Sequence, residues 1–140
     1  MKGIVLLSHG PLAKGMYETT GWFMGPQIPQ YDYLCLEMED SPEEFDERLS
    51  QKIKEVDSGD GVILIADLLG GTPCNRALLT SENGNVDLLA GMNLAMVLQL
   101  LGNRLSDNYD MSELESVARQ GVSYMNPSSA NEEDDFFAEL

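Results

Sequence analysis

Basic residues are scarce in this sequence. Eight lysines and arginines stand against 24 acidic residues, and the formal net charge is −16 at pH 7. A protein surface of this sign repels phosphate backbones and anionic membrane surfaces. The composition therefore argues against nucleic acid as a partner and favours a basic protein.

Histidine and cysteine are also scarce. The chain has one histidine, His9, and two cysteines, Cys35 and Cys74, which form no CxxC pair. Zinc sites in proteins are built mainly from several Cys and His ligands. The composition therefore predicts free thiols and no metal site.

A signal peptide and long apolar runs are missing as well. Met1-Lys2-Gly3 leads directly into a short apolar run, without the charged and apolar regions of a signal peptide. No apolar segment approaches the roughly 20 residues that a membrane span needs. We therefore expect a reduced, cytoplasmic protein that does not insert into a membrane. The chain of 140 residues fits one domain with its own core.

Four strand-like segments, separated by helical patterns, make up most of the chain. Residues 3–7 and 62–66 are continuous apolar runs, as in central parallel strands that are covered on both faces. Residues 31–37 and 86–90 are predicted as two further strands. Helices are expected at residues 12–24, 42–56, 73–81, 94–101 and 111–121.

Two of these helices carry specific local signals. The stretch Ser41-Pro42-Glu43-Glu44 combines a serine cap, a proline at the first helical position and a glutamate at the third. In the first helix, apolar or small residues recur at spacings of four, three and four, which predicts a buried stripe. This predicted stripe consists of Leu12, Met16, Thr19 and Phe23.

Strands that alternate with helices at this spacing predict an α/β fold. We expect a single doubly wound, mostly parallel sheet of four strands with helices on both faces. Residues 122–125 are expected to add a short antiparallel edge strand. Residues 1–125 then form the domain, and residues 126–140, with five acids and no base, form an acidic, flexible tail.

Chemistry-bearing residues follow three of the predicted strands. His9, Asp67 and the turn at residues 91–93 lie at the carboxyl ends of strands, where they can share one crevice. A carboxylate that accepts the proton of one ring nitrogen leaves the other nitrogen free as a nucleophile. Taken singly, His9 could satisfy a loop hydrogen bond and Asp67 could cap a helix; their pairing favours catalysis.

The segment after Asp67 has the composition of an anion site. Gly70, Gly71 and Thr72 precede a helix whose first residue is predicted to be Pro73, with Thr72 as its cap. Unpaired N–H groups and the positive end of the helix dipole favour phosphate at such a position. Nucleophile, orienting carboxylate and phosphate cradle are thus predicted together.

Several nucleotide and hydrolase motifs are absent. The sequence has no GxxxxGK[ST] loop, no GxGxxG and no GxSxG, which disfavours ATP, a dinucleotide and serine hydrolysis. Covalent catalysis by histidine remains: His9 takes a phosphoryl group from one carrier and passes it to another.

Three motifs resemble a known family. They are Ser8-His9-Gly10 after the first strand, Asp67-Leu68-Leu69-Gly70-Gly71-Thr72-Pro73 with Asn75 after the third, and Gly91-Met92-Asn93-Leu94 after the fourth. In this order and at these intervals they resemble the IIA component of the mannose-type sugar phosphotransferase system. That family includes fructose, mannose, sorbose and N-acetylgalactosamine members.

The resemblance implies a phosphocarrier that works without a cofactor. The small carrier protein HPr would donate its phosphoryl group to His9, and His9 would donate to the IIB component, which phosphorylates the sugar during uptake through the membrane components IIC and IID. Asp67 would orient His9. The expected phosphate contacts are Gly10, Gly70, Gly71 and Thr72, and the expected partner contacts are Phe23, Met24, Met92 and Asn93. The family also implies a homodimer in which the last strand is exchanged.

Other functions remain open at the level of sequence. A phosphorylation-dependent regulatory module would use the same histidine. A tetrapyrrole metal chelatase also carries Ser-His-Gly after its first strand, but it usually needs further ligands, and this chain has one histidine. In histidine phosphatases and mutases the nucleophile follows an arginine, and here Ser8 holds that position.

Overall fold

Four parallel strands form the centre of the molecule. The computed structural model describes residues 1–82 and 84–127. Its strands lie in the order β2-β1-β3-β4, and every neighbouring pair is parallel. The bounds are Gly3–His9 for β1, Tyr31–Leu36 for β2, Val62–Ala66 for β3 and Val86–Ala90 for β4.

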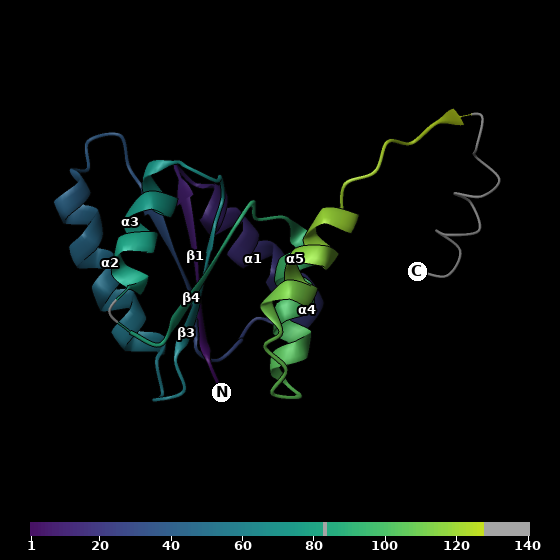
Figure 1. The fold of residues 1–140 in the computed structure, drawn as a ribbon, viewed down its shortest axis with the longest axis horizontal. Helices are drawn as coiled ribbons and strands as arrows, with labels where there is room; N and C mark the ends of the chain where they lie inside the picture. Colours follow the sequence, from purple (N-terminus) through teal and green to yellow (C-terminus); the bar gives the residue numbers. More distant parts are fainter. Residues whose placement is uncertain (83, 128–140) are drawn as a thin grey trace.

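Helices cover both faces of this sheet (Figure 1). On one face lie α1 (Leu12–Met24), α4 (Leu94–Arg104) and α5 (Met111–Gln120), and on the other α2 (Pro42–Val56) and α3 (Thr72–Ser81). Side chains alternate along a strand, so Ile4 and Leu6 of β1 enter the core beneath α1 and α4. Val5 and Leu7 enter the core beneath α2 and α3. The predicted α/β sheet of four parallel strands with helices on both faces is therefore confirmed.

Successive strands are added first on one side of β1 and then on the other. From β1 the chain moves outward to β2, and then crosses back so that β3 pairs with the other side of β1. The connections that leave β1 and β3 consequently turn to opposite faces, which opens a crevice at their carboxyl ends. This topology places the residues that follow β1 and β3 beside each other.

The predicted buried stripe of α1 is wrong at its two ends, whereas Met16 packs against the core as predicted. Leu12 is 53% exposed and Phe23 is 62% exposed, whereas Ala13 and Thr20 are completely buried. The inner face of the helix is shifted by about one residue from the predicted stripe, to Ala13 and Thr20. The Thr20 hydroxyl is also paired there with the Tyr31 hydroxyl, at 2.8 Å.

Five element ends differ from the prediction, and two of them, the ends of β2 and α5, come one residue early. Strand β1 continues to His9, which pairs in register with Leu36 of β2. Helix α3 begins one residue earlier than predicted, with Gly71 as its cap and Thr72 as its first residue. Helix α4 runs one turn further, to Arg104, whose buried guanidinium binds backbone carbonyls. The capping box predicted at Ser41 is present.

The carboxyl-terminal segment departs from the prediction. Residues 122–125 belong to no strand of this chain and extend away from the body of the molecule (Figure 1). The predicted edge strand is therefore not formed within the chain. Of the predicted acidic tail, residues 128–140 lie outside the described part of the structure.

Candidate functional site

His9 ends β1 and is followed at once by a tight turn into α1. Gly10 has a positive φ of 55°, a conformation that favours glycine. The buried Ser8 hydroxyl accepts the Ala13 N–H at 2.7 Å and donates to the Gly10 carbonyl at 2.8 Å. Ser8 thus fixes the turn that carries His9. We predicted no such role for it, although a serine shortly before a helix start commonly accepts a backbone N–H.

His9 and Asp67 are paired directly. The Asp67 Oδ2 atom lies 2.9 Å from His9 Nδ1 and accepts the His9 backbone N–H at 3.0 Å. Asp67 is itself held by its backbone N–H, which donates to the Leu7 carbonyl of β1 at 3.0 Å. A carboxylate in this position assigns the proton to Nδ1 and leaves Nε2 with its lone pair. The imidazole is 45% exposed, so Nε2 can meet a reactant.

The Asp67 carboxylate is enclosed and incompletely paired. Its side chain is 9% exposed, and within residues 1–82 and 84–127 its buried Oδ1 has no hydrogen-bond partner. Both bonds from His9 reach the other oxygen. Asp67 is therefore joined to the His9 loop through one oxygen, which receives a hydrogen bond from the backbone and one from the ring.

The loop after β3 brings a glycine against the imidazole ring. A Cβ atom on Gly71 would lie 2.5 Å from His9 Cε1 and 3.2 Å from Nε2. Gly70 has a φ of +82°, and its carbonyl accepts the Asn75 amide at 3.1 Å, which closes the loop. Only glycine at position 71 lets the ring edge that carries Nε2 face the beginning of α3.

Helix α3 presents its amino terminus to this ring edge. It has no side-chain cap, and its second residue is Pro73, which has no N–H. The first N–H groups of a helix have no partner within the helix, and together with the dipole they attract anions. Thr72 and His9 line one hollow of about 300 Å³. The predicted phosphate contacts Gly10, Gly71 and Thr72 therefore surround His9.

Acidic and apolar groups border the site. The Glu37 N–H donates to Asp40 at 2.7 Å and, with Arg48, holds the pKa of that carboxyl below its usual value. Asp40 and His9 line the same hollow. On the other side of His9, an apolar groove of about 530 Å³ runs along α1 past Leu12 and Leu94. The surroundings therefore combine negative charge with apolar surface.

The predicted partner contacts are not gathered in one place. Phe23 and Met24 lie in the last turn of α1, at the opposite end of that helix from His9. Met92 and Asn93 follow β4 at the carboxyl edge, where Asn93 caps α4 and donates to the Ala118 carbonyl at 2.7 Å. These four contacts stay predictions.

Three leucines near the His9 and Asp67 loops are exposed. Leu12 is 53% exposed, Leu68 58% and Leu69 81%. They follow His9 and Asp67 closely in the chain, a position that could have identified them. Leucines of this kind suit a surface that meets another protein.

The described residues offer no alternative centre built on metal ligands. Among residues 1–82 and 84–127, no group of three or more His, Cys, Asp or Glu side chains could hold a metal ion. In the same part of the chain, no helix combines the length and apolar character that a membrane crossing requires.

Comparison with known proteins identifies the family. The family model described as "PTS system fructose IIA component", where PTS is the sugar phosphotransferase system, matches residues 3–117. The chain belongs to this family. The match contains both loops that form the His9 site, and the predicted resemblance to mannose-type IIA components is confirmed. The protein is thus a IIA component of a phosphotransferase system.

Relatives of known sequence belong to the same family. The fructose-specific EIIA component of Bacillus subtilis is 24% identical over 110 residues, which cover 74% of this chain and 71% of that protein. The mannose-specific EIIAB component of Escherichia coli K12 is 27% identical over 126 residues, 85% of this chain. The chain spans 38% of the length of that protein.

Solved IIA structures share the fold. A IIA protein associated with the fucose utilization operon of Streptococcus pneumoniae has a TM-score of 0.80 and 28% identity, covering 88% of this chain and 92% of that one. The mannose/sorbose-specific IIA subunit of Enterococcus faecalis has a TM-score of 0.77 and 26% identity, covering 90% and 96%. The sheet and its five helices are therefore those of a IIA component.

Proposed function

We propose that this IIA protein carries a phosphoryl group on His9 Nε2, receiving it from phosphorylated HPr and passing it to a IIB component during sugar uptake. The observation that carries the proposal is the pairing of His9 Nδ1 with Asp67 at 2.9 Å. It leaves Nε2 available on the ring edge that faces Gly71 and the start of α3. Family membership supports the same role.

Phosphoryl transfer from HPr to His9 needs no cofactor. The Nε2 lone pair attacks the phosphorus of the donor, and a new N–P bond forms while the bond from phosphorus to the donor's imidazole breaks. The bonding electrons return to that imidazole, which leaves. The proton on His9 Nδ1 stays in place, held by Asp67, and the ring becomes positive. Transfer to the IIB component runs by the same chemistry, with a nucleophile of IIB as the attacking group.

In this mechanism Asp67 and the start of α3 have different roles. Asp67 balances the positive charge that the ring acquires, and as its carboxylate is largely buried the interaction is only weakly screened by water. The N–H groups at the start of α3 and the Thr72 hydroxyl bind the phosphoryl oxygens. Gly10 and Gly71 leave the space that the phosphoryl group needs.

The surface around His9 suits transient protein partners. Exposed leucines near the site provide apolar contact, and the charge of −16 is complementary to basic carriers. Complementary charge mainly accelerates encounter, as a rapid relay requires. We place this activity in residues 1–125, with residues 126–140 as an acidic extension.

A labelling experiment tests the proposed function. The protein is incubated with labelled phosphoenolpyruvate, enzyme I and HPr, and an acid-labile, base-stable phosphoryl group is sought. Because the chain has one histidine, His9→Ala must lose all such label. Two-dimensional ¹H–¹⁵N spectra of the imidazole then distinguish the two phosphorylated nitrogens. Label that survives in His9→Ala contradicts the proposal, and phosphorylation at Nδ1 contradicts the assignment to Nε2.

We also propose that the protein is a homodimer in which residues 122–125 pair with β4 of a second copy. Strand β4 is at an edge of the sheet, and such an edge presents unpaired backbone groups. Val122 and Tyr124 are 79% and 86% exposed. A hollow of about 300 Å³ that includes Leu89 and Ala90 lies beside that edge.

The oligomeric state tests the exchanged strand. Sedimentation equilibrium should give a dimer for the native chain and for Tyr124→Phe. Tyr124→Pro should give a monomer, because proline removes an N–H and fits poorly in a paired strand. A native chain that is a monomer at tens of micromolar, or a Tyr124→Pro variant that stays dimeric, would refute the arrangement.

A further inference from the structure

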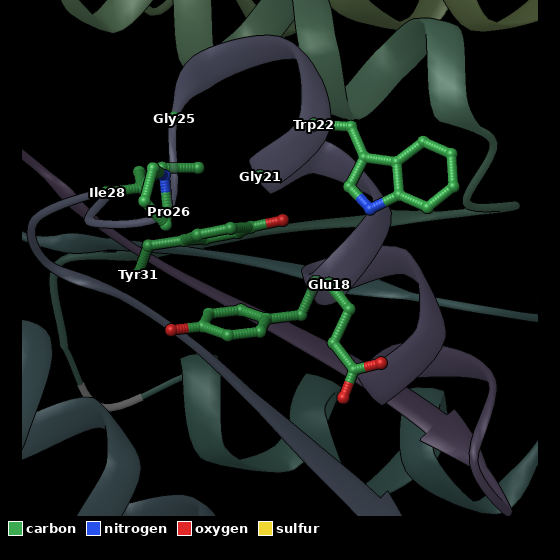
Figure 2. Close-up of a pocket in the computed structure, with 8 residues that line it drawn as sticks. Glu18, Gly21, Trp22, Gly25, Pro26, Ile28 and Tyr31 are labelled. Carbon is green, nitrogen blue, oxygen red and sulfur yellow. The ribbon is translucent and has the colours of Figure 1, made fainter.

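A second pocket lies at the other end of α1 from His9 (Figure 2). It measures about 250 Å³, and it is lined by the last turns of α1, by the connection that follows and by the first residue of β2. Ten residues of helix separate Leu12 from Trp22, which corresponds to about 15 Å. The pocket is therefore separate from the proposed phosphoryl site.

Aromatic rings form much of its lining. The rings of Tyr17 and Tyr31 lie with their centroids 4.9 Å apart and their planes inclined by 30°. Trp22 is 87% exposed and also lines the pocket. Figure 2 shows Tyr31 between Ile28, on the side of the connection, and Trp22 and Glu18, on the side of the helix. The aromatic lining thus combines the largely buried ring of Tyr31, which is 6% exposed, with the exposed indole of Trp22.

The tyrosine at the base of the pocket is neutral and hydrogen-bonded. The Tyr31 hydroxyl is 2.8 Å from the Thr20 hydroxyl. Burial raises the pKa of Tyr31 to about 12. Its ring therefore acts as a π surface, whose negative face attracts cations.

The charged side chain in the pocket lining is acidic. It belongs to Glu18, and the ion pairs among residues 1–82 and 84–127 do not include it. The last turn of α1 has no basic residue, although the negative end of a helix dipole favours a cation there. Arg104 binds three backbone carbonyls and does not line the pocket.

Gly25 ends α1 with a φ of +92°, which by itself favours glycine. Gly21 is inside the helix, and a Cβ atom on it would meet only the Pro26 Cα atom, at 3.9 Å. A glycine inside a helix costs about 1 kcal/mol relative to alanine. Local packing would admit alanine at position 21, so it does not explain this loss of helix stability. The space beside Gly21 belongs to the pocket.

We propose that this pocket binds a small organic ammonium cation. The cationic group lies against the rings of Tyr17, Trp22 and Tyr31, and the Glu18 carboxylate balances its charge. Aromatic faces combined with a carboxylate are the general solution for quaternary and alkylated ammonium groups. A pocket of about 250 Å³ admits a head group with a few carbon atoms.

Trp22 provides a direct measurement, because it is the chain's only tryptophan. Choline and its neutral isostere 3,3-dimethyl-1-butanol are titrated to tens of millimolar while indole fluorescence and the indole N–H resonance are followed. A saturable change with choline, at least fivefold tighter than any change with the alcohol, is expected. Equal responses to the two compounds would overturn the proposal.

A third probe identifies the source of the cation. Nα-acetyl-lysine methylamide presents the ammonium group as a protein would. Tighter binding of choline assigns the pocket to a free small molecule, and tighter binding of the lysine compound assigns it to a side chain of a partner protein. Both results support a cation site, whereas no saturable binding of either cation refutes it.

Matched variants locate the binding. Glu18→Gln should weaken choline binding about fivefold, the upper range for an exposed charge pair. Glu47→Gln, which removes the same charge from α2, should leave it unchanged. Gly21→Leu should abolish binding by filling the pocket, and Gly21→Ala should retain it. Identical affinities in all four variants would place the cation elsewhere.

The phosphocarrier role of His9 and the cation site can be tested independently of each other. His9 phosphorylation should be unchanged in Glu18→Gln, because Glu18 lies in the middle of α1 and lines neither hollow at His9. A protein that is labelled by HPr but does not bind choline refutes only the cation site. A protein that binds choline but is not labelled refutes only the phosphocarrier role.

Discussion

At the amino edge of the sheet, where the strands begin, side chains from distant segments join the elements together. The Arg104 guanidinium, at the end of α4, donates hydrogen bonds of 2.6–3.2 Å to the carbonyls of Lys2, Pro29 and Gln30. The Gln30 side-chain amide donates in turn to the carbonyls of Met1 and Val56. These bonds link α4, α2 and the ends of two strands.

At the carboxyl edge, the hydrogen bonds lie largely within the functional loops. Ser8 closes the turn at Gly10, and Asn75 closes the loop at Gly70. The contact between the two loops is the pair of His9 and Asp67, in which one buried carboxylate oxygen is unpaired. The long-range hydrogen bonds are therefore concentrated at one edge and the proposed chemistry at the other, so variants at the two edges should have different effects.

Arg104→Met gives the largest expected effect and tests the amino edge. Burial lowers the pKa of Arg104, and the side chain makes no ion pair within the described residues. Methionine keeps the volume but leaves three carbonyls without this donor, so the free energy of unfolding should fall by about 3 kcal/mol. Urea denaturation measures the loss. The rate of His9 phosphorylation in the folded protein should stay unchanged.

A second arginine serves as the control. Arg119 is paired with Glu115 on the surface of α5, with 78% of its side chain exposed. Arg119→Met should change the free energy of unfolding by less than about 0.5 kcal/mol. Equal losses of unfolding free energy in Arg104→Met and Arg119→Met would mean that the hydrogen bonds of Arg104 do not stabilise the amino edge.

Asp67→Asn tests the carboxyl edge. An amide oxygen can still accept the His9 backbone N–H, so the fold should be kept. The ring loses the charge that balances it, and phosphoryl transfer from HPr should slow by on the order of 100-fold. Rapid-quench measurement of the labelled protein gives the rate. Asp60→Asn, the same substitution at the amino edge, should transfer at the native rate; a native rate for Asp67→Asn would remove this carboxylate from the mechanism.

Features that depend on neighbouring residues in the chain could be predicted from the sequence. The buried strands follow from continuous apolar runs such as residues 62–66, and the start of α2 follows from its capping box. The meeting of His9 and Asp67 also follows from the sequence, because parallel strands with helical crossovers bring the ends of β1 and β3 together.

Features that depend on distant contacts could not be predicted. The orientation of α1 is set by polar contacts with Ser8 and Tyr31, and the apolar spacing alone fits two adjacent stripes. The last turn of α4 exists because Arg104 reaches carbonyls more than 70 residues away. At the site, the role of Gly71 depends on the position of one ring to within an ångström, which no sequence pattern contains.

Gly71→Ala should have an intermediate effect at the carboxyl edge. The backbone of Gly71 is extended, with φ −78° and ψ 169°, so alanine is not strained there. Its Cβ atom would lie 2.5 Å from His9 Cε1 and must displace the ring. We expect phosphoryl transfer to slow about tenfold, because a small misplacement of a reacting group is costly.

Gly70→Ala, in the same loop, should lower the free energy of unfolding rather than the rate of transfer. Space is open at Gly70, but its φ of +82° is unfavourable for alanine. The free energy of unfolding should fall by about 1 kcal/mol, while the His9 ring keeps its place. Urea denaturation and labelling rates on both variants separate the two causes. A slower rate in Gly70→Ala alone would mean that loop conformation, rather than contact with the ring, controls the transfer.

Asp46→Asn should have the smallest effect, and it tests the ion pair that connects α2 to the first turns of α3. The Arg76 Nε atom donates to Asp46 at 2.9 Å. This bond holds the pKa of Asp46 below its ordinary value of 3.8 in the folded protein. A lowered folded-state pKa means that the stabilisation is present above the ordinary value and is lost as the pH falls through the folded-state value.

The pH dependence distinguishes this charge effect from packing. Asp46→Asn should be slightly less stable than the native protein at pH 7, near the limit that urea denaturation resolves, and the difference should shrink as the pH falls below the ordinary value of 3.8. A difference that does not shrink with falling pH would show that lost packing is the cause. The pair lies on the carboxyl side of the sheet but outside the His9 loops, so transfer should change less than about twofold. A larger fall would mean that α3 needs this pair to hold its first turn against His9, and that the carboxyl edge also depends on its own ion pair.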